Sequence, residues 1–499
     1  MKVALLRGFN SRMSSHIQTR AQAKSSMLVL QKYYKEESMG SVLFSSDEIL
    51  SLLANAVPHA LVTEKQALAE ASGDKSGQTS SGPPLCVIEA RNIGDVVTVV
   101  KIASQLGVPI VTRGGGSGLA GGAIGGPGEI VLSLVKMNRI IEISNEDRWA
   151  VVEAGVINGD LNQAAMARGL WFAPDPASRK WSTVGGNIAT NAGGLLCMKY
   201  GVTREAVLEL TVVLADGKVI KVGHQTVKGV TGYDLCALMV GSEGTLGIIC
   251  EARVALKPLN QHPVWTISGR GAHIGLATRA AEETISQGLQ PALMELLDEP
   301  SVRHVSALLA IKQEHSGTVQ LIAQTDGAGS EEEAGKIAET WRECGLDVEV
   351  GEDREDLIEF RRAMHPAMVA LGQVLIEDIA VPRSSLGEMF AAIRQIEKDF
   401  EIEIPTVAHA GDGNLHPNFV YSGLEIPDNV WEAANALFRK AVSLGGTLTG
   451  EHGVGLLKRR WLQEELGQTQ WDLQWGIKKL FDPKGILNPG KVFDPNSQP

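Results

Sequence analysis

The segment RGGGSGLAGG, residues 113–122, carries six glycines in ten positions and follows a short apolar run, residues 109–113, that is typical of a β-strand. Backbone amides that no Cβ shields can approach a bound group closely, and a pyrophosphate is the natural guest. The segment is neither a GxGxxG that opens a helix nor a P-loop, because GK[ST] is missing. By itself the segment is equally compatible with a flexible loop, so the rest of the sequence has to distinguish a phosphate-binding loop from a flexible one.

Two more clusters of small residues lie downstream. PDPASRKWSTVGGNIATNAGG occupies residues 174–194, and GYDLCALMVGSEGTLGII begins at residue 232. Around the clusters, short β-branched runs alternate with helical patterns. We expect strands at residues 86–90, 130–133, 150–153, 208–214, 218–222 and 247–257, and a helix at residues 95–106. Three such clusters in one α/β block indicate a long cofactor held between two subdomains.

The composition changes at about residue 260, where a second unit is expected. Strand patterns at residues 264–268, 319–324 and 347–350 alternate with helical patterns at residues 272–287 and 330–344. A β-α-β-β-α-β sheet covered by helices, acting as a cap, is the economical interpretation. The closing segment FDPKGILNPGKVF is rich in proline and glycine, so we expect it to be extended and turn-rich.

These patterns predict four parts of the chain. They are a basic, disordered leader at residues 1–40, a cofactor-binding block at 41–260, a cap at 261–455, and a C-terminal segment at 456–499 that returns to the first block.

The overall composition is that of an ordinary globular protein, with 499 residues, 44% of them apolar and 21% charged. The net charge of -12 argues against nucleic acid as a partner. Five scattered cysteines without CxxC spacing fit a reducing compartment and give no ligand set for an iron-sulfur cluster. No apolar stretch reaches the roughly 18 residues that a membrane span needs. We expect a cytoplasmic protein, with any attachment to the inner membrane peripheral.

The first 35 residues contain lysine, arginine and serine but no acid, the first acid being Glu36. Such a composition resembles a mitochondrial transit peptide. The alternative, favoured because the stretch lacks an amphipathic arginine helix, is a disordered leader or an over-extended start, with Met27 or Met39 as the natural first residue.

A candidate metal site is spread over two motifs. AHAGDGNLHPN places His409 and His416 around a glycine turn, and GEHGVG adds Glu451 and His452. Glycine accepts the positive φ that reverses the chain, so His409 should end one strand and His416 open the next, sharing a face with Asn418. Two imidazoles and one carboxylate make a catalytic type of metal site, with a position left open. Two histidines near a turn are more often surface or capping residues, so the context has to decide.

The motifs RGGGSG, PDPxSxxxxTVGGNxAxNAGG, GYDLxxLxVGSEGTLG, HAGDGNLHPN, GEHGVG and DPKGILNPGK, in that order, resemble those of the FAD-dependent 2-hydroxyacid dehydrogenases of the vanillyl-alcohol-oxidase superfamily. The chain is most similar to the branch of glycolate dehydrogenase flavoprotein subunits, D-lactate dehydrogenases and D-2-hydroxyglutarate dehydrogenases, over residues 43–493. The resemblance implies an α+β fold, with a two-subdomain FAD-binding domain of the PCMH (p-cresol methylhydroxylase) type under a ferredoxin-like α+β cap.

The same resemblance implies which residues bind FAD. Those that would hold the pyrophosphate are Arg113, Gly114, Gly115, Gly116, Ser117 and Gly118. Those that would line the rest of the cofactor are Pro174, Asp175, Thr183, Gly185, Gly186, Asn187, Asn191, Gly193, Glu243, Gly247 and Ile248. In relatives with covalently attached flavin a histidine stands four residues after the loop arginine, whereas here Ser117 stands there, so FAD should be non-covalent.

The implied metal, zinc or manganese, would be held by His409, His416 and Glu451. It would chelate the substrate's hydroxyl and one carboxylate oxygen and lower the pKa of the hydroxyl. His452 would take the hydroxyl proton as general base, and hydride would pass from C2 to flavin N5.

The substrate's carboxylate needs a counter-charge. Arg361 resembles the family's carboxylate-binding arginine, although Arg362 beside it leaves the register open to question, and an exposed helix arginine is the alternative. Asn418 would add a hydrogen bond. In the hydroxyglutarate branch a lysine helps to bind a second carboxylate, but Ile376 occupies the matching place here. We therefore expect oxidation of a small D-2-hydroxy acid, D-lactate or glycolate.

Two rival functions remain. One is a D-2-hydroxyglutarate dehydrogenase, which Ile376 disfavours, and the other is a catalytically silent FAD-binding subunit of an electron-transfer complex, which the complete metal and base set disfavours. With no cysteine cluster of its own, the chain should pass electrons to an acceptor protein or a quinone-linked subunit. A homodimer is compatible with the sequence, which does not fix the oligomeric state.

Overall fold

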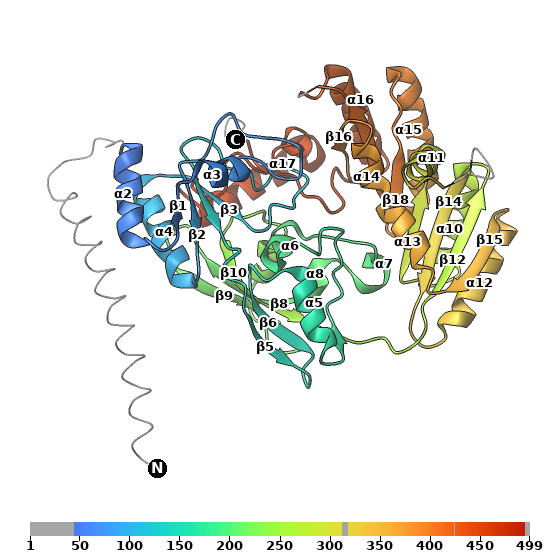
Figure 1. The fold of residues 1–499 in the computed structure, drawn as a ribbon, viewed down its shortest axis with the longest axis horizontal. Coiled ribbons are helices and arrows are strands. Elements are labelled where there is room, and N and C mark those ends of the chain that lie inside the picture. The colour runs from blue at the N-terminus through green and yellow to red at the C-terminus, as the bar shows by residue number, and fades with distance from the viewer. Residues whose placement is uncertain (1–43, 312–317, 424, 495–499) are drawn as a thin grey trace, which may run out of the picture.

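The computed structural model describes residues 44–311, 318–423 and 425–494, and the expected leader lies outside these ranges. An N-terminal block and a cap lie side by side, and the chain returns from the cap to the block near its end (Figure 1). The block contains two sheets with different patterns of pairing, as the two-subdomain expectation requires.

The first sheet has the order β1-β2-β4-β3, with β2, β4 and β3 parallel. Its elements are α2 (Ser46–Ala56), β1 (Leu61–Val62), α3 (Lys65–Ala71), β2 (Cys86–Glu89), α4 (Ile93–Leu106), β3 (Ile110–Arg113) and β4 (Ile130–Ser133). Asn92 caps the first turn of α4, and Gly107 ends that helix at a φ of 70°. The helix carries the chain between two parallel strands, and β3 delivers the glycine segment at its carboxyl end.

The second sheet is antiparallel, in the order β5-β6-β10-β8-β9. Its strands are β5 (Ile140–Ser144), β6 (Trp149–Glu153), β8 (Val207–Val213), β9 (Val219–Gly223) and β10 (Ile248–Ala255). The shorter elements around it are α5 (Asn158–Met166), β7 (Leu170–Trp171), α6 (Val184–Thr190), α7 (Cys197–Tyr200), α8 (Thr203–Ala206), α9 (Leu235–Met239) and β11 (Lys257–Pro258). A hairpin turn joins β8 to β9, with Gly217 at a φ of 78°.

The cluster at residues 174–194 contains the helix α6, which forms despite its two glycines. The Thr183 side chain accepts a hydrogen bond from the Gly186 amide and so caps the helix, and Asn191 ends it in the left-handed region at a φ of 51°. The glycines obscure this helix in the sequence, and the N-cap residue Thr183 is the feature that indicates it.

The cap is built on one eight-stranded sheet, in the order β15-β12-β14-β13-β18-β19-β16, with β17 pairing β19. Its first half contains β12 (Trp265–Gly271), α10 (Ile274–Ser286), β13 (Leu293–Leu297), α11 (Glu299–Leu308), β14 (Val319–Thr325), α12 (Ser330–Glu343) and β15 (Asp347–Glu352). The antiparallel order β15-β12-β14-β13 is ferredoxin-like, as expected, with α11 added between β13 and β14.

The sheet is larger than the expected single β-α-β-β-α-β unit, because a second set of strands joins it where β18 pairs with β13. This half contains α13 (Glu355–Arg362), α14 (Met364–Val369), β16 (Gln373–Ile376), β17 (Ile379–Ala380), α15 (Leu386–Phe400), β18 (Thr406–His409), β19 (Asn414–Tyr421) and α16 (Asp428–Ser443). Helices α10, α12, α15 and α16 cover one face of the sheet, and α11, α13 and α14 cover the other. Leu195 and Leu196 of the N-terminal block pack against the second face, which therefore meets the block.

The chain leaves the cap through α17 (Arg459–Phe481), which is kinked at Gly467, and ends in the extended, turn-rich segment that was predicted. The Ile110 amide of β3 donates to the Ile486 carbonyl, and the Asn488 amide donates to the Ile110 carbonyl. The C-terminal segment thus adds to the exposed edge of the first sheet.

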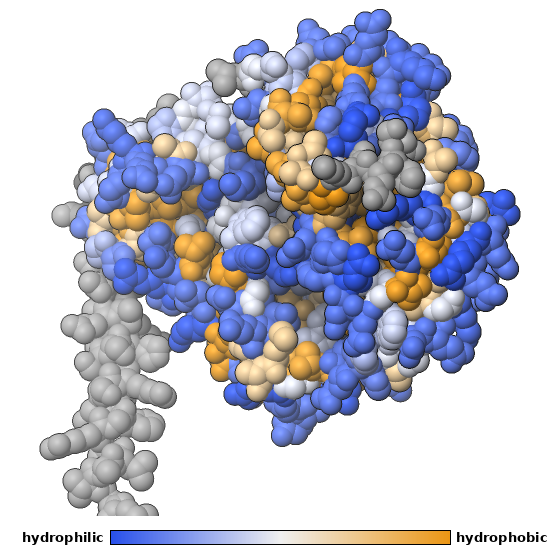
Figure 2. Space-filling model, turned by 45° about the vertical axis from the view of Figure 1, so that its right-hand side comes forward, coloured by the Kyte–Doolittle hydropathy of each residue, from blue (hydrophilic) through white to orange (hydrophobic). Residues whose placement is uncertain are grey.

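In the part of the chain that the structure describes, no helix is both long and apolar enough to cross a membrane. The face turned forward in Figure 2 is predominantly hydrophilic, and its apolar residues gather in smaller patches.

A substitution at Lys478 tests how much the C-terminal segment contributes to the stability of the block. Its buried ammonium donates to the carbonyls of Thr245 and Leu487, at 2.8 Å each, and to the Asp482 carboxylate at 2.6 Å. In Lys478→Met the Asp482 carboxylate stays buried without its counter-charge, a loss of roughly 3–5 kcal/mol. We expect a thermal unfolding midpoint several degrees lower, whereas the exposed neighbour variant Lys479→Met should unfold like the wild type. Equal midpoints for the two variants would contradict this account.

Candidate active site

The β18–β19 hairpin positions both histidines of the first motif. The register pairs Val407 with His416 and His409 with Asn414, so the two imidazoles lie diagonally on one face of the sheet. Gly413, at a φ of 78°, supplies the turn between the strands. The ring centroids of the histidines are 5.0 Å apart, and both side chains are buried. As predicted, His409 ends one strand and His416 lies near the start of the next.

Glu451 reaches these imidazoles from the loop before α17. Its Oε1 lies 3.3 Å from His409 Nε2 and 3.2 Å from His416 Nε2. Three ligands at about 2.0–2.1 Å from a tetrahedral ion stand roughly 3.3 Å from one another, so this donor set fits a divalent cation. Burial disfavours protonation of His409, but Glu295 and Glu451 outweigh it and raise the pKa of His409 well above its usual value. The site therefore attracts positive charge.

His409 has a carboxylate behind it. Glu295 lies directly opposite on β13, and its Oε1 is 2.6 Å from His409 Nδ1. The other oxygen of Glu295 accepts from Arg361 Nε at 2.7 Å, and all three side chains are buried. The Nδ1–Glu295 contact leaves His409 Nε2 directed at Glu451, as metal-binding histidines require.

Arg361, expected to meet the substrate, thus has its Nε on Glu295. Asn418, the other expected substrate contact, turns its amide to the backbone, donating to the carbonyls of Pro405 at 3.1 Å and His416 at 2.8 Å. In this arrangement Arg361 supports His409 through Glu295, and Asn418 holds the backbone beside His416.

His452 lies beside the candidate ligands. Its ring stacks on His416 with centroids 5.0 Å apart and planes inclined by 15°. Burial lowers the pKa of His452 to about 4, so the imidazole is neutral at physiological pH. A neutral buried imidazole next to a metal site is the form that a general base requires.

Asp378 connects the hairpin to the loop of Glu451 and His452. It is fully buried, its Oδ1 accepts from Asn414 Nδ2 at 2.8 Å, and its Oδ2 accepts from the amides of Glu451 and His452 at 3.0 and 2.8 Å. Burial raises the pKa of Asp378, but the charges of His452, Lys458 and His416 and the His452 amide outweigh it and hold that pKa well below its usual range. Two parts of the site that are far apart in sequence therefore meet on one carboxylate.

The first two glycine clusters pack against each other. A Cβ on Gly114 would lie 2.3 Å from Thr183 Oγ1, and one on Gly115 would lie 2.2 Å from the Trp181 carbonyl oxygen, whereas one on Gly118 would meet open space. Only glycine permits this approach, and the Gly118 position leaves backbone accessible to a ligand. The arrangement fits a bound pyrophosphate.

Arg113 turns away from that open space. Its guanidinium donates to the carbonyls of Glu70, Gly73 and Ala123, and so ties the glycine loop to the preceding segment. A ligand of the glycine loop would therefore meet backbone amides and not the Arg113 guanidinium.

Some of the other expected cofactor residues lie around α6, and others pack inside the second sheet. Asn187 accepts from Asn158 Nδ2 at 3.2 Å, and burial raises the pKa of Asp175 to about 7. Ile248 is buried in the core, and a Cβ on Gly247 would lie 2.5 Å from a Val212 methyl group, so these two pack within the second sheet. The remaining ones, Pro174, Gly185, Gly186 and Asn191, lie at or beside α6.

Glu243, in the third glycine cluster, holds the loop that carries Glu451. Glu243, at a φ of 51°, accepts from the amides of Val454 at 2.7 Å and Gly455 at 2.9 Å. A Cβ on Gly193 would lie 2.3 Å from Glu451 Oε2. The loop of Glu451 therefore lies directly on the expected cofactor segments, and the two predicted sites form one.

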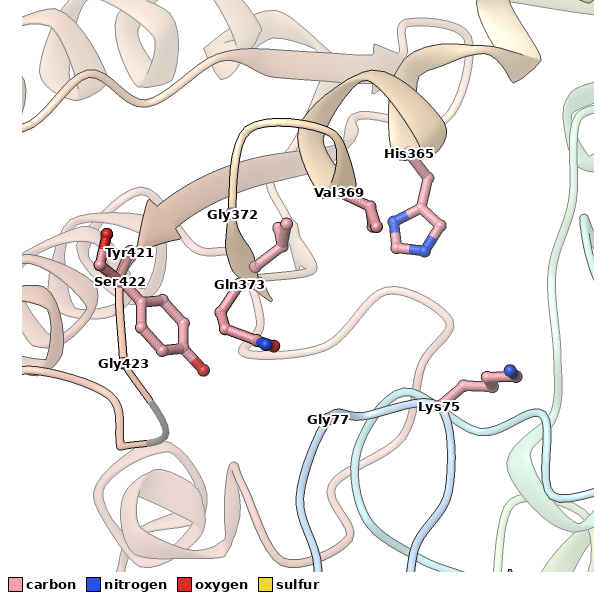
Figure 3. Close-up of a pocket in the computed structure, with 10 residues that line it drawn as sticks. Lys75, Gly77, His365, Val369, Gly372, Gln373, Tyr421, Ser422 and Gly423 are labelled. Atoms are coloured by element: carbon pink, nitrogen blue, oxygen red, sulfur yellow. The ribbon is translucent and has the colours of Figure 1, made fainter.

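An open pocket of about 570 Å³ is lined by residues of both the block and the cap. In Figure 3, Lys75 of the block and His365 of the cap lie on one side of the pocket, and Gln373 and Tyr421 lie on the other. No carboxylate lines this pocket. The β16–β19 pair runs from it, where Gln373 pairs with Tyr421, toward Asn418 and the hairpin.

The sequence interpretation missed three contributors. Glu295 had a usable signal, since it is a lone acid inside the apolar run LMELL. The sequence interpretation assigned no role in the site to Asp378, or to Lys458, which donates to the carbonyls of Asp378 and Leu448.

The comparisons with known proteins agree with this geometry. A family model described as FAD binding domain matches residues 84–223, and one described as FAD linked oxidases, C-terminal domain, matches residues 272–492. The glycolate oxidase subunit GlcD of Bacillus subtilis is 39% identical over 431 residues, which cover 85% of this chain and 91% of that protein. A D-lactate dehydrogenase of Archaeoglobus fulgidus is 37% identical, over 81% of this chain and 90% of its own length.

Solved structures show the same fold at low sequence identity. p-Cresol methylhydroxylase with substrate bound superposes with a TM-score of 0.71 at 16% identity, covering 93% of this chain and 99% of the other. An alkyldihydroxyacetonephosphate synthase gives a TM-score of 0.70 at 18% identity, covering 92% of each chain. The chain is an FAD-linked oxidoreductase, and it belongs to the 2-hydroxyacid dehydrogenase branch of the PCMH-type FAD-linked oxidases.

Proposed function

We propose that this protein oxidises a small D-2-hydroxy acid, D-lactate or glycolate, to the 2-oxo acid, with a divalent metal held by His409, His416 and Glu451. The observation that carries the proposal is the meeting of this buried donor set with the cofactor segments, through Gly193 and Glu243. A metal site lying against a flavin site suits the removal of a proton and a hydride from one alcohol.

The donor set fits zinc or manganese and leaves room for a chelating substrate. Such an ion supplies a Lewis acid that lowers the pKa of the substrate hydroxyl. Glu295 accepts a hydrogen bond from Nδ1 of His409 and so directs the Nε2 atom of that imidazole toward the position of the ion.

FAD, when bound, supplies the hydride acceptor. The Gly114–Gly118 amides would meet its pyrophosphate, since Arg113 is engaged with carbonyls. Ser117 in place of a histidine supports non-covalent binding.

His452 would act as the general base. Its low pKa keeps it unprotonated before substrate arrives, and its stacking on His416 holds the ring beside the metal ligands. The backbone N–H of His452 donates to the Asp378 carboxylate, and this hydrogen bond fixes the backbone that carries the ring.

The substrate class rests on charge and space. Lys75 places a positive charge at the pocket between the block and the cap, and Ile376 offers no partner for a second carboxylate on the β16 edge. The two nearest acids, Glu377 and Asp378, are buried toward Lys458. A monocarboxylic acid is therefore favoured over D-2-hydroxyglutarate.

The electron acceptor is proposed to be a second protein or a quinone-linked subunit. The name of the Bacillus subtilis relative describes a subunit, which supports assembly with a partner. All five cysteines are free in the structure and too scattered to hold a cluster.

Removal of the metal tests the proposal directly. Under anaerobic conditions D-lactate or glycolate should bleach the flavin of the metal-loaded protein, because the ion activates the hydroxyl. A chelator should abolish bleaching without releasing FAD, and zinc or manganese should restore it. Reduction at the normal rate in metal-free protein would rule out the metal-assisted mechanism, and no reduction by any of D-lactate, L-lactate, glycolate or D-2-hydroxyglutarate would favour the silent-subunit alternative.

Replacement of His452 tests the base. In His452→Asn the rate of flavin reduction should fall by about 10²-fold or more, since general-base catalysis contributes that much. FAD content and metal content should stay at wild-type levels. The exposed His262 serves as control, and His262→Asn should reduce at the wild-type rate. A His452→Asn protein as fast as this control would exclude the role.

Replacement of Ile376 tests the choice of substrate. Ile376→Lys supplies a cation for a distal carboxylate and should raise kcat/KM for D-2-hydroxyglutarate relative to D-lactate by about tenfold, the effect of roughly 1.4 kcal/mol. Ile376→Met, which changes shape without adding charge, should leave the ratio unchanged. Wild-type protein that already prefers D-2-hydroxyglutarate would overturn the assignment to small acids.

A further inference from the structure

We infer that Asp378 is a positioning residue that builds the metal site, by holding the Glu451–His452 loop on the hairpin and by facing Nδ1 of both His416 and His452. The inference rests on the proposed metal-dependent function and concerns a residue outside the proposed donor set of His409, His416 and Glu451.

The hydrogen bonds of Asp378 come from two separate segments. From the loop, its Oδ2 accepts from Thr449 Oγ1 at 2.7 Å and from the amides of Glu451 and His452. From the hairpin, its Oδ1 accepts from Asn414 Nδ2 at 2.8 Å. Four donors on one buried carboxylate fix the loop relative to the strands more firmly than packing of a glycine-rich loop alone could.

The same carboxylate faces two imidazoles. His416 Nδ1 lies 3.7 Å from Asp378 Oδ1, and His452 Nδ1 lies 4.0 Å from Asp378 Oδ2. Both Nδ1 atoms are buried, and neither has a hydrogen-bond partner among the described residues. A lone pair there would repel the carboxylate, whereas an N–H is attracted to it, so both rings are driven to the Nδ1–H tautomer.

That tautomer leaves Nε2 of each ring as the free lone pair. His416 Nε2 is the atom 3.2 Å from Glu451, where the cation would lie, and the Nε2 of His452 becomes the basic atom. Glu295 does the same for His409 at 2.6 Å, so each metal-binding histidine has its own carboxylate. Asp378 differs from Glu295 because it orients the base and the third ligand as well.

The experiment is metal binding by Asp378→Asn, measured with zinc or manganese alone by chelator competition on FAD-loaded protein. Asparagine has the same shape, but its amide group meets backbone N–H donors and an imidazole N–H without a negative charge. We expect metal affinity to fall 10- to 100-fold with FAD content unchanged. At saturating metal, flavin reduction should remain at least tenfold slow, because His452 has lost its orientation.

Glu377→Gln is the matched control, since Glu377 is the adjacent buried carboxylate and lies 3.7 Å from Lys458. It should bind metal and reduce flavin like the wild type. Thr449→Val removes one donor to Asp378 and provides a milder variant, with a few-fold loss of metal affinity, should Asp378→Asn fail to accumulate.

The outcomes separate the two proposals. Wild-type protein that binds no metal overturns the proposed function, whatever Asp378 does. Wild-type protein that binds metal, with Asp378→Asn equal to it in affinity and rate, overturns the inference alone. If Asp378→Asn binds weakly but regains the full rate at saturating metal, the tautomer argument is wrong.

Discussion

The active site depends on the burial of negative charge. Glu243, Glu295, Asp378 and Glu451 are all largely removed from water, and an isolated buried carboxylate is strongly unfavourable. Each is therefore matched by amides, a guanidinium, an ammonium or imidazoles from another segment. These matches dictate which segments must meet, and the proposed cation at the Glu451 end would complete the compensation.

The compensating groups come from every part of the chain. Glu243 in the N-terminal block holds the loop of the third ligand, and Lys458 at the start of α17 donates to the Asp378 backbone. The cap supplies the hairpin, while the block supplies glycines that let Glu451 approach. Neither half contains a complete site, which explains why the motifs are spread over more than 300 residues.

The sequence predicted the parts whose physics is local. The strands of both sheets other than β1 and β5, and the hairpin around Gly413, followed from periodicity and glycine placement. The second half of the cap sheet did not, because β13–β18 pairing joins strands more than 100 residues apart. The orientation of Arg361 toward Glu295, and of Asn418 toward backbone, likewise depends on partners that no local pattern identifies.

The C-terminal segment has a consequence for biogenesis. It pairs with β3, and Asn488 donates to the carbonyls of both Gly122 and Glu243, so it bridges the two subdomains of the block. Those partners leave the ribosome hundreds of residues earlier and must wait for it. The two subdomains can therefore be bridged in this way only once residues up to Asn488 have been synthesised.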